Sequence, residues 1–66
     1  MSSLADTMPV EQKRCRELLV AYRDIGPNGL FGAAVIEDAL HRADLAMAGG
    51  DVVDILRSYE ELKNLK

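Results

Sequence analysis

The chain has 66 residues, a formal net charge of −3, one cysteine and one histidine. This length allows one small domain, and so few cysteine and histidine side chains provide neither a disulfide framework nor a zinc site to stabilise it. The negative charge argues against generic binding to phosphate backbones or anionic membranes, and the apolar runs are too short to span a bilayer. Because the start lacks the pattern of a secretory signal, we expect a cytoplasmic protein without a membrane partner.

The first predicted helix spans residues 9–25. The preceding residues 1–8 are mostly small and polar, and we expect them to form a flexible N-terminus outside a single helical domain of residues 9–66. Proline is tolerated in the first turn of a helix, so Pro9 marks the start. Apolar side chains then recur at helical spacing, at Val10, Cys15, Leu18, Leu19, Tyr22 and Ile25. Gly26-Pro27-Asn28-Gly29 ends the helix, because the residue before proline avoids helical geometry.

Basic side chains gather on one face of this helix. Lys13, Arg16 and Arg23 align with Val20 on a helical wheel, and such a stripe can bind an acidic protein surface or nucleic-acid phosphates. The simpler interpretation is a solvated face, or cations that pair with Glu and Asp of the second and third helices. The acidity of the chain and the lack of interleaved aromatic residues count against nucleic acid, so an acidic protein is the better functional partner.

The second predicted helix spans residues 30–48 and has two apolar stripes. One follows the four-three-four spacing of a coiled-coil seam and consists of Ile36, Leu40, Ala43 and Met47. The neighbouring stripe holds mostly small residues and consists of Gly32, Val35, Ala39 and Ala46. Small residues let another helix approach closely, so we expect this helix to be central, with neighbours on two sides.

The segment that opens the second helix, Gly29-Leu30-Phe31-Gly32-Ala33, resembles the opening of some viral fusion peptides, which insert apolar residues into lipid. The match is short and acidic residues follow it closely, so packing explains it better than membrane insertion. We expect Phe31 to plug one end of the core, and the small residues to seat the first helix against the second.

A helix stop and a helix start stand back to back at Ala48-Gly49-Gly50-Asp51. Glycine can take the left-handed conformation that closes a helix, and Asp51 can accept hydrogen bonds from the N–H groups that open the next one. The third predicted helix therefore spans residues 52–63 and forms a tight hairpin with the second. No strand-like alternation occurs, so the sequence predicts an all-α, three-helix protein.

Groups that could carry chemistry are scarce. Cys15 falls among apolar positions and is predicted to be a structural thiol, and His41 lies on the predicted outer face without a second metal ligand. The sequence has no serine paired with a histidine and an acid, and no phosphate-binding glycine motif. We therefore expect no enzyme, no catalytic residue, no metal and no cofactor.

Two resemblances cover part of the chain. Residues 43–62, with Ala46, Gly50-Asp51, Tyr59 and Leu62, are similar to the turn and second helix of a tetratricopeptide-type hairpin, which implies hairpin geometry. Residues 10–62 resemble short helical proteins of proteobacterial genomes and their prophages. The segments that carry this likeness are Cys15-Arg16-Glu17-Leu18-Leu19, Ile25-Gly26-Pro27, Phe31-Gly32-Ala33 and Gly50-Asp51-Val52-Val53. This second likeness implies a compact standalone protein related to phages or mobile elements, and it implies no activity. An adaptor or inhibitor is the role that we consider for such a protein.

The leading functional hypothesis is a protein–protein interaction module that forms a homodimer. Three amphipathic helices with two apolar stripes on the middle one leave apolar surface that a single small chain cannot hide. The predicted interface consists of Ile36, Leu40, Ala43, Met47, Tyr59 and Leu62. The alternative is a small DNA-associated regulator whose stripe of Lys13, Arg16 and Arg23 contacts phosphates.

Overall fold

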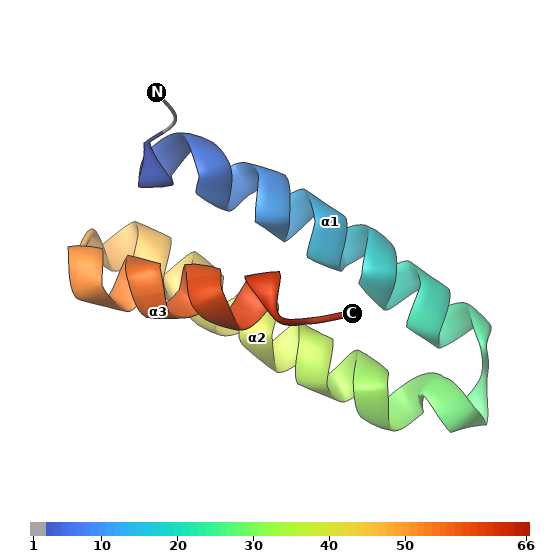
Figure 1. The fold of residues 1–66 in the computed structure, drawn as a ribbon. Helices are drawn as coiled ribbons and strands as arrows, with labels where there is room; N and C mark the ends of the chain where they lie inside the picture. The colour runs from blue at the N-terminus through green and yellow to red at the C-terminus, as the bar shows by residue number, and fades with distance from the viewer. Residues whose placement is uncertain (1–2) are drawn as a thin grey trace.

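The computed structural model describes residues 3–66 as three α-helices without a strand. The helices are α1 (Leu4–Asp24), α2 (Leu30–Gly49) and α3 (Val52–Lys63), and a 3₁₀ turn, η1 (Pro27–Gly29), joins the first two. Figure 1 shows α1 and α2 as a long antiparallel hairpin, with the shorter α3 packed beside it. The predicted all-α, three-helix fold and the hairpin of the second and third helices are confirmed.

The first helix begins earlier than predicted. Ser3 caps it, because its Oγ accepts a hydrogen bond from the Asp6 N–H at 3.2 Å and its own N–H donates to the Asp6 carboxylate at 3.4 Å. Pro9 therefore lies inside α1, where a proline lacks the N–H that would bond the carbonyl four residues earlier. Residues 4–8, predicted to be part of a flexible N-terminus, belong to this helix instead, and Met8 is fully buried; residues 1 and 2 lie outside the described residues.

The joint between α2 and α3 follows the sequence closely. Gly50 adopts the left-handed conformation (φ = 75°), and its N–H donates to the Ala46 carbonyl. Asp51 Oδ1 then accepts the N–H groups of Val53 and Asp54 at 2.9 and 3.4 Å, which opens α3.

One end of the α1–α2 hairpin lies beyond the reach of α3. The molecule measures 38 × 22 × 16 Å, and the connection between α1 and α2 extends past the point where the chain ends (Figure 1). The core lies where three helices meet, and its buried apolar residues are Met8, Cys15, Leu19, Ala33, Ile36, Ala39, Leu40, Ala43 and Leu62. The hairpin end is therefore only two helices thick.

Small residues do seat α1 against α2 at this end, but Phe31 does not plug the core. A Cβ atom added at Gly32 would overlap the ring of Tyr22, so the two helices cross closely there. Phe31 is 83% exposed, which contradicts the prediction of a buried plug. The close crossing of Tyr22 on Gly32 already fills the space between the helices, and Phe31 is left outside it.

Candidate interaction surface

The predicted interface is largely the core of the single chain. Ile36, Leu40, Ala43 and Leu62 are each at most 7% exposed, because α1 and α3 cover the two sides of the α2 seam. Met47 and Tyr59 are half-buried at the edge of this core. A partner could reach the four buried residues only if the helices separated.

The arginines of the basic stripe on α1 form ion pairs with acids of α2. Arg16 pairs with Asp44 at 3.5 Å and Arg23 with Glu37 at 2.5 Å, so the predicted pairing with acids of the second helix is confirmed for both arginines. Lys13 is exposed and makes no ion pair with any residue from 3 to 66. Because each of the two arginines has its own carboxylate, the stripe presents little net positive charge to a partner.

A shallow groove runs beneath these two ion pairs. Its floor contains Leu19, Val20 and Leu40, and the exposed His41 lies at its edge. The four other charged residues that line the groove are engaged with each other, Arg16 with Asp44 and Arg23 with Glu37.

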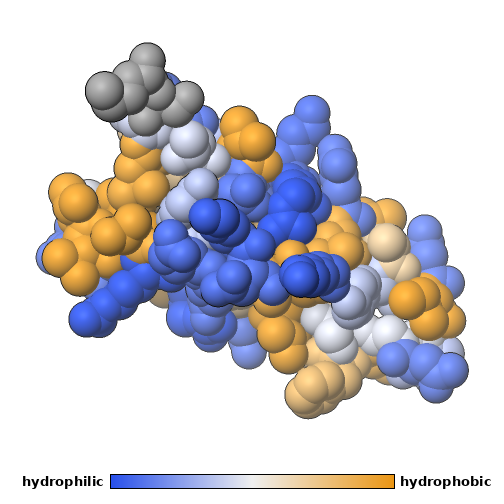
Figure 2. Space-filling model, viewed as in Figure 1, coloured by the Kyte–Doolittle hydropathy of each residue, from blue (hydrophilic) through white to orange (hydrophobic). Residues whose placement is uncertain are grey.

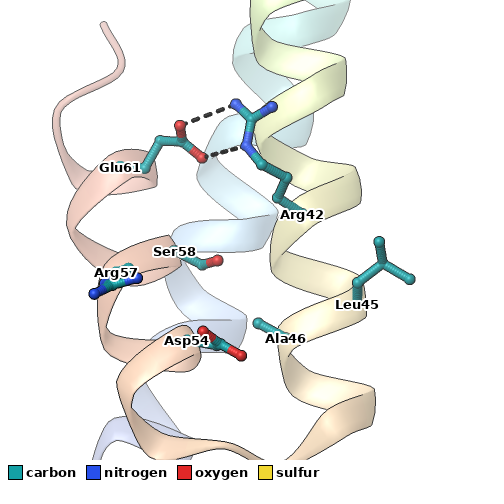
Figure 3. Close-up of a pocket in the computed structure, with 7 residues that line it drawn as sticks. All are labelled: Arg42, Leu45, Ala46, Asp54, Arg57, Ser58 and Glu61. Carbon is teal, nitrogen blue, oxygen red and sulfur yellow. Dashed lines mark hydrogen bonds and ion pairs between the residues drawn. The ribbon is translucent and has the colours of Figure 1, made fainter.

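A second groove lies between α2 and α3. Figure 3 shows Arg42 and Glu61 joined across it by two hydrogen bonds, of 3.0 and 2.9 Å, and the bonded carboxylate raises the pKa of Arg42. Ser58 and Asp54 line the same wall of α3. The opposite charges of Arg42 and Glu61 therefore cancel, and this ion pair links α2 to α3 across the groove.

A polar clamp holds the end of the chain against α1. Arg14 donates to the carbonyls of Leu62 and Leu65 at 2.6 and 2.9 Å, and the hydroxyl of Tyr22 donates to the Lys66 carbonyl at 2.5 Å. Glu11 accepts from Arg14 at 2.8 Å and raises its pKa. The clamp adds side-chain donors to carbonyls at and just beyond the end of α3, where the Leu62 carbonyl also accepts the Leu65 N–H at 3.1 Å.

Cys15 lies beneath this clamp and is fully buried. Its Sγ lies 3.5 Å from the Leu62 carbonyl oxygen, and burial raises the pKa of the thiol above its usual value. A buried thiol held in its neutral form is a packing group, as the sequence predicts for this position. Among residues 3–66 no three or more His, Cys, Asp or Glu side chains come together in a group that could hold a metal ion.

The exposed apolar side chains are the remaining feature, and Figure 2 shows apolar surface at several places along the molecule, its two ends included. The hairpin-end patch consists of Ile25, Phe31 and Val35, which are 60%, 83% and 41% exposed. The α3 patch consists of Val52, Val53 and Leu56, which are 68%, 56% and 49% exposed. Helical spacing placed Ile25 and Val35 on apolar stripes of their helices, and both are exposed in the structure.

Comparisons with known proteins found no protein similar to this chain. No family model, curated protein or solved structure matches the chain. In the described part of the chain, no helix combines the length and apolar character needed to cross a membrane.

Proposed function

We propose that the chain is a small, non-enzymatic protein–protein interaction module that works as a homodimer. The balance between exposed and buried apolar residues carries this proposal. Ten large apolar side chains of the described residues are more than two-fifths exposed. The buried large ones are five, namely Met8, Leu19, Ile36, Leu40 and Leu62. Exposed apolar patches on a small protein mark surfaces that another protein covers.

The lack of enzymatic activity is part of the same proposal. The thiol of Cys15 is enclosed by core residues, and Arg16, Arg23 and Arg42 are bonded to carboxylates of neighbouring helices. A catalytic site needs a nucleophile or a proton-transferring group within reach of a bound substrate. A role as an adaptor or inhibitor would instead use the apolar surface.

Sedimentation equilibrium over the micromolar concentration range tests the homodimer directly. We expect a species of twice the 7.2 kDa protomer mass, with dissociation on dilution and helical circular dichroism throughout. A protein that stays helical and monomeric at every concentration would overturn the proposal. Variants at Leu40 or Met47 are unsuitable here, because Leu40 is buried and Met47 packs against the core of the chain itself.

No observation favours a DNA-associated regulator over this proposal. Arg16 and Arg23 would have to leave Asp44 and Glu37 before they could bind phosphates, and the overall charge is negative. We expect duplex DNA to keep its electrophoretic mobility with this protein at low salt. A shift that disappears as salt is added would reinstate the regulator.

A further inference from the structure

The third helix contributes little to the shared apolar core. Of the nine buried apolar residues that form the core of the described chain, eight lie on α1 or α2 and one, Leu62, lies on α3. The α3 patch occupies the first two turns of this helix and is exposed. Ser58 is the other buried residue of α3, and its side chain is small and polar. Burial of apolar surface therefore holds α3 less firmly than it holds α1 against α2.

The polar contacts of α3 with the other two helices lie at its C-terminal end. In the described part of the chain, every side-chain hydrogen bond that joins α3 and the residues after it to α1 or α2 involves a residue from 61 to 66. These bonds are the clamp, with its donors Arg14 and Tyr22, the Cys15 thiol, and the pair of Arg42 with Glu61. The helix is thus fixed at its far end by polar groups and at its near end by the chain itself.

The connection at the near end is not packed against the rest of the molecule. Nothing lies within 4 Å of a Cβ atom added at Gly49 or at Gly50. Glycine has access to both signs of φ, so Gly50 can leave its φ of 75° at little steric cost. Hinges are a few residues at the ends of elements that absorb such changes, and these two glycines fit that description.

The α1–α2 hairpin has contacts of its own that do not involve α3. Gln12 is buried and donates to the Asp44 carboxylate at 3.1 Å, and Arg16 pairs with the same carboxylate. Toward the other end of the hairpin, the ring of Tyr22 lies against Gly32. These contacts, together with the eight core residues on α1 and α2, remain when α3 moves away.

We propose that α3 is a lid that opens as one unit about Gly49 and Gly50 while α1 and α2 stay paired, and that the clamp holds this lid shut. Segments with few buried apolar contacts are the ones that open locally in a folded protein. Opening moves Leu62 away and uncovers the apolar face of α1 and α2 on which it rests. The lid therefore gives the protein an apolar surface that is accessible only in the open form, whatever its oligomeric state.

Cys15 reports on the lid, because Leu62 lies against it. Its Sγ is 3.5 Å from the Leu62 carbonyl oxygen, and the residue is fully buried. N-ethylmaleimide can label this thiol only when it is uncovered, and the sequence contains no other cysteine. Labelling followed by mass spectrometry at rising urea concentrations therefore measures the opening. We expect the labelling rate to depend on urea less steeply than global unfolding does, since opening of α3 exposes less surface than unfolding of the whole chain.

Two variants separate opening of the lid from unfolding of the chain. Arg14→Ala removes the charged donor of the clamp and should raise the labelling rate about tenfold. Leu19→Val is the matched control, because Leu19 is buried and lines the groove between α1 and α2. This variant should lower the free energy of unfolding measured by circular dichroism. Its labelling rate should stay that of the wild type, since the contacts of Leu19 with α2 persist in the open form.

The outcomes decide between the two routes to a labelled thiol. Labelling of the wild type that follows global unfolding in urea would overturn the proposal, and so would labelling of Leu19→Val that is faster in proportion to its loss of stability. Should Arg14→Ala lose its helical signal, Tyr22→Phe replaces it, because this change removes only the hydroxyl that donates to the Lys66 carbonyl. Tyr22→Phe should also be labelled faster than the wild type, and an unchanged rate would reject the clamp as the closure of the lid.

Discussion

Replacing Gly32 by alanine tests the close crossing of α1 and α2. An alanine at an unobstructed helical glycine stabilises a protein by ~1 kcal/mol, because it removes backbone freedom from the unfolded chain. At Gly32 the added Cβ would lie less than 3.0 Å from the Cδ2 and Cε2 atoms of Tyr22. Carbon atoms in favourable contact are ~3.5–4.0 Å apart, so the Tyr22 ring has to move by more than ~0.5 Å.

The size of the effect follows from these two opposing contributions. Overpacking of this kind costs ~1–3 kcal/mol, against the ~1 kcal/mol gained from helix propensity, so Gly32→Ala should lower the free energy of unfolding by up to ~2 kcal/mol. In a Tyr22→Ala background the ring that obstructs the added Cβ is absent, so Gly32→Ala should raise the free energy of unfolding. The difference between the two backgrounds is the coupling energy, and we expect ~1–3 kcal/mol.

Urea denaturation followed by circular dichroism measures all four members of this cycle. The protomer concentration must be fixed, since dimerisation would raise the apparent stability. Gly49→Ala is the matched control, because Gly49 is also helical and nothing lies within 4 Å of its added Cβ. Equal stabilisation by Gly32→Ala and Gly49→Ala, with no coupling to Tyr22, would refute the close crossing.

Three further substitutions test the clamp, the cap and the buried thiol. Arg14→Ala removes hydrogen bonds to the Leu62 and Leu65 carbonyls and should lower the free energy of unfolding by ~1–3 kcal/mol in urea titrations, and an unchanged midpoint would contradict the clamp. Asp51→Ala should cost ~0.5–2 kcal/mol in the same assay, whereas Asp51→Asn, which can still cap, should cost much less. The Cys15 pKa is raised above 9.0 in the folded chain, so the unfolded chain loses that proton first, and stability should fall as pH rises past this value. Cys15→Ser should lack this part of the pH dependence, and identical pH profiles for both proteins would argue against a buried neutral thiol.

The predicted interface shows what the helical periodicity of apolar residues can predict and what it cannot. The spacing of Ile36, Leu40 and Ala43 correctly marks an apolar stripe, but a stripe looks the same in sequence whether its own chain or a partner covers it. The structure covers it with α1 and α3, which leaves these residues in the core. The basic stripe has the same ambiguity, because the acids that neutralise Arg16 and Arg23 lie on a different helix.

The hairpin-end patch could be found only in part from the sequence. Ile25 and Val35 belong to apolar stripes of their helices, and Gly32 belongs to a stripe of small residues that predicts close approach. The sequence did not indicate that Tyr22 would occupy the space beside Gly32 and leave Phe31 outside. The outcome depends on where two helices cross, which is a contact between distant parts of the chain.

By itself, the sequence of this protein determined the helices and the joint between the last two. Helix formation, capping by Asp51 and closure at Gly50 depend on interactions within a few residues. Such local interactions can be predicted from the order of the amino acids. Ser3 and Asp6 form a capping box as well, which is a local signal that the predicted helix start at Pro9 did not use. Only the tertiary structure decided which apolar faces meet. Because α3 is shorter than the hairpin it packs on, part of that hairpin keeps an apolar face that this chain cannot bury.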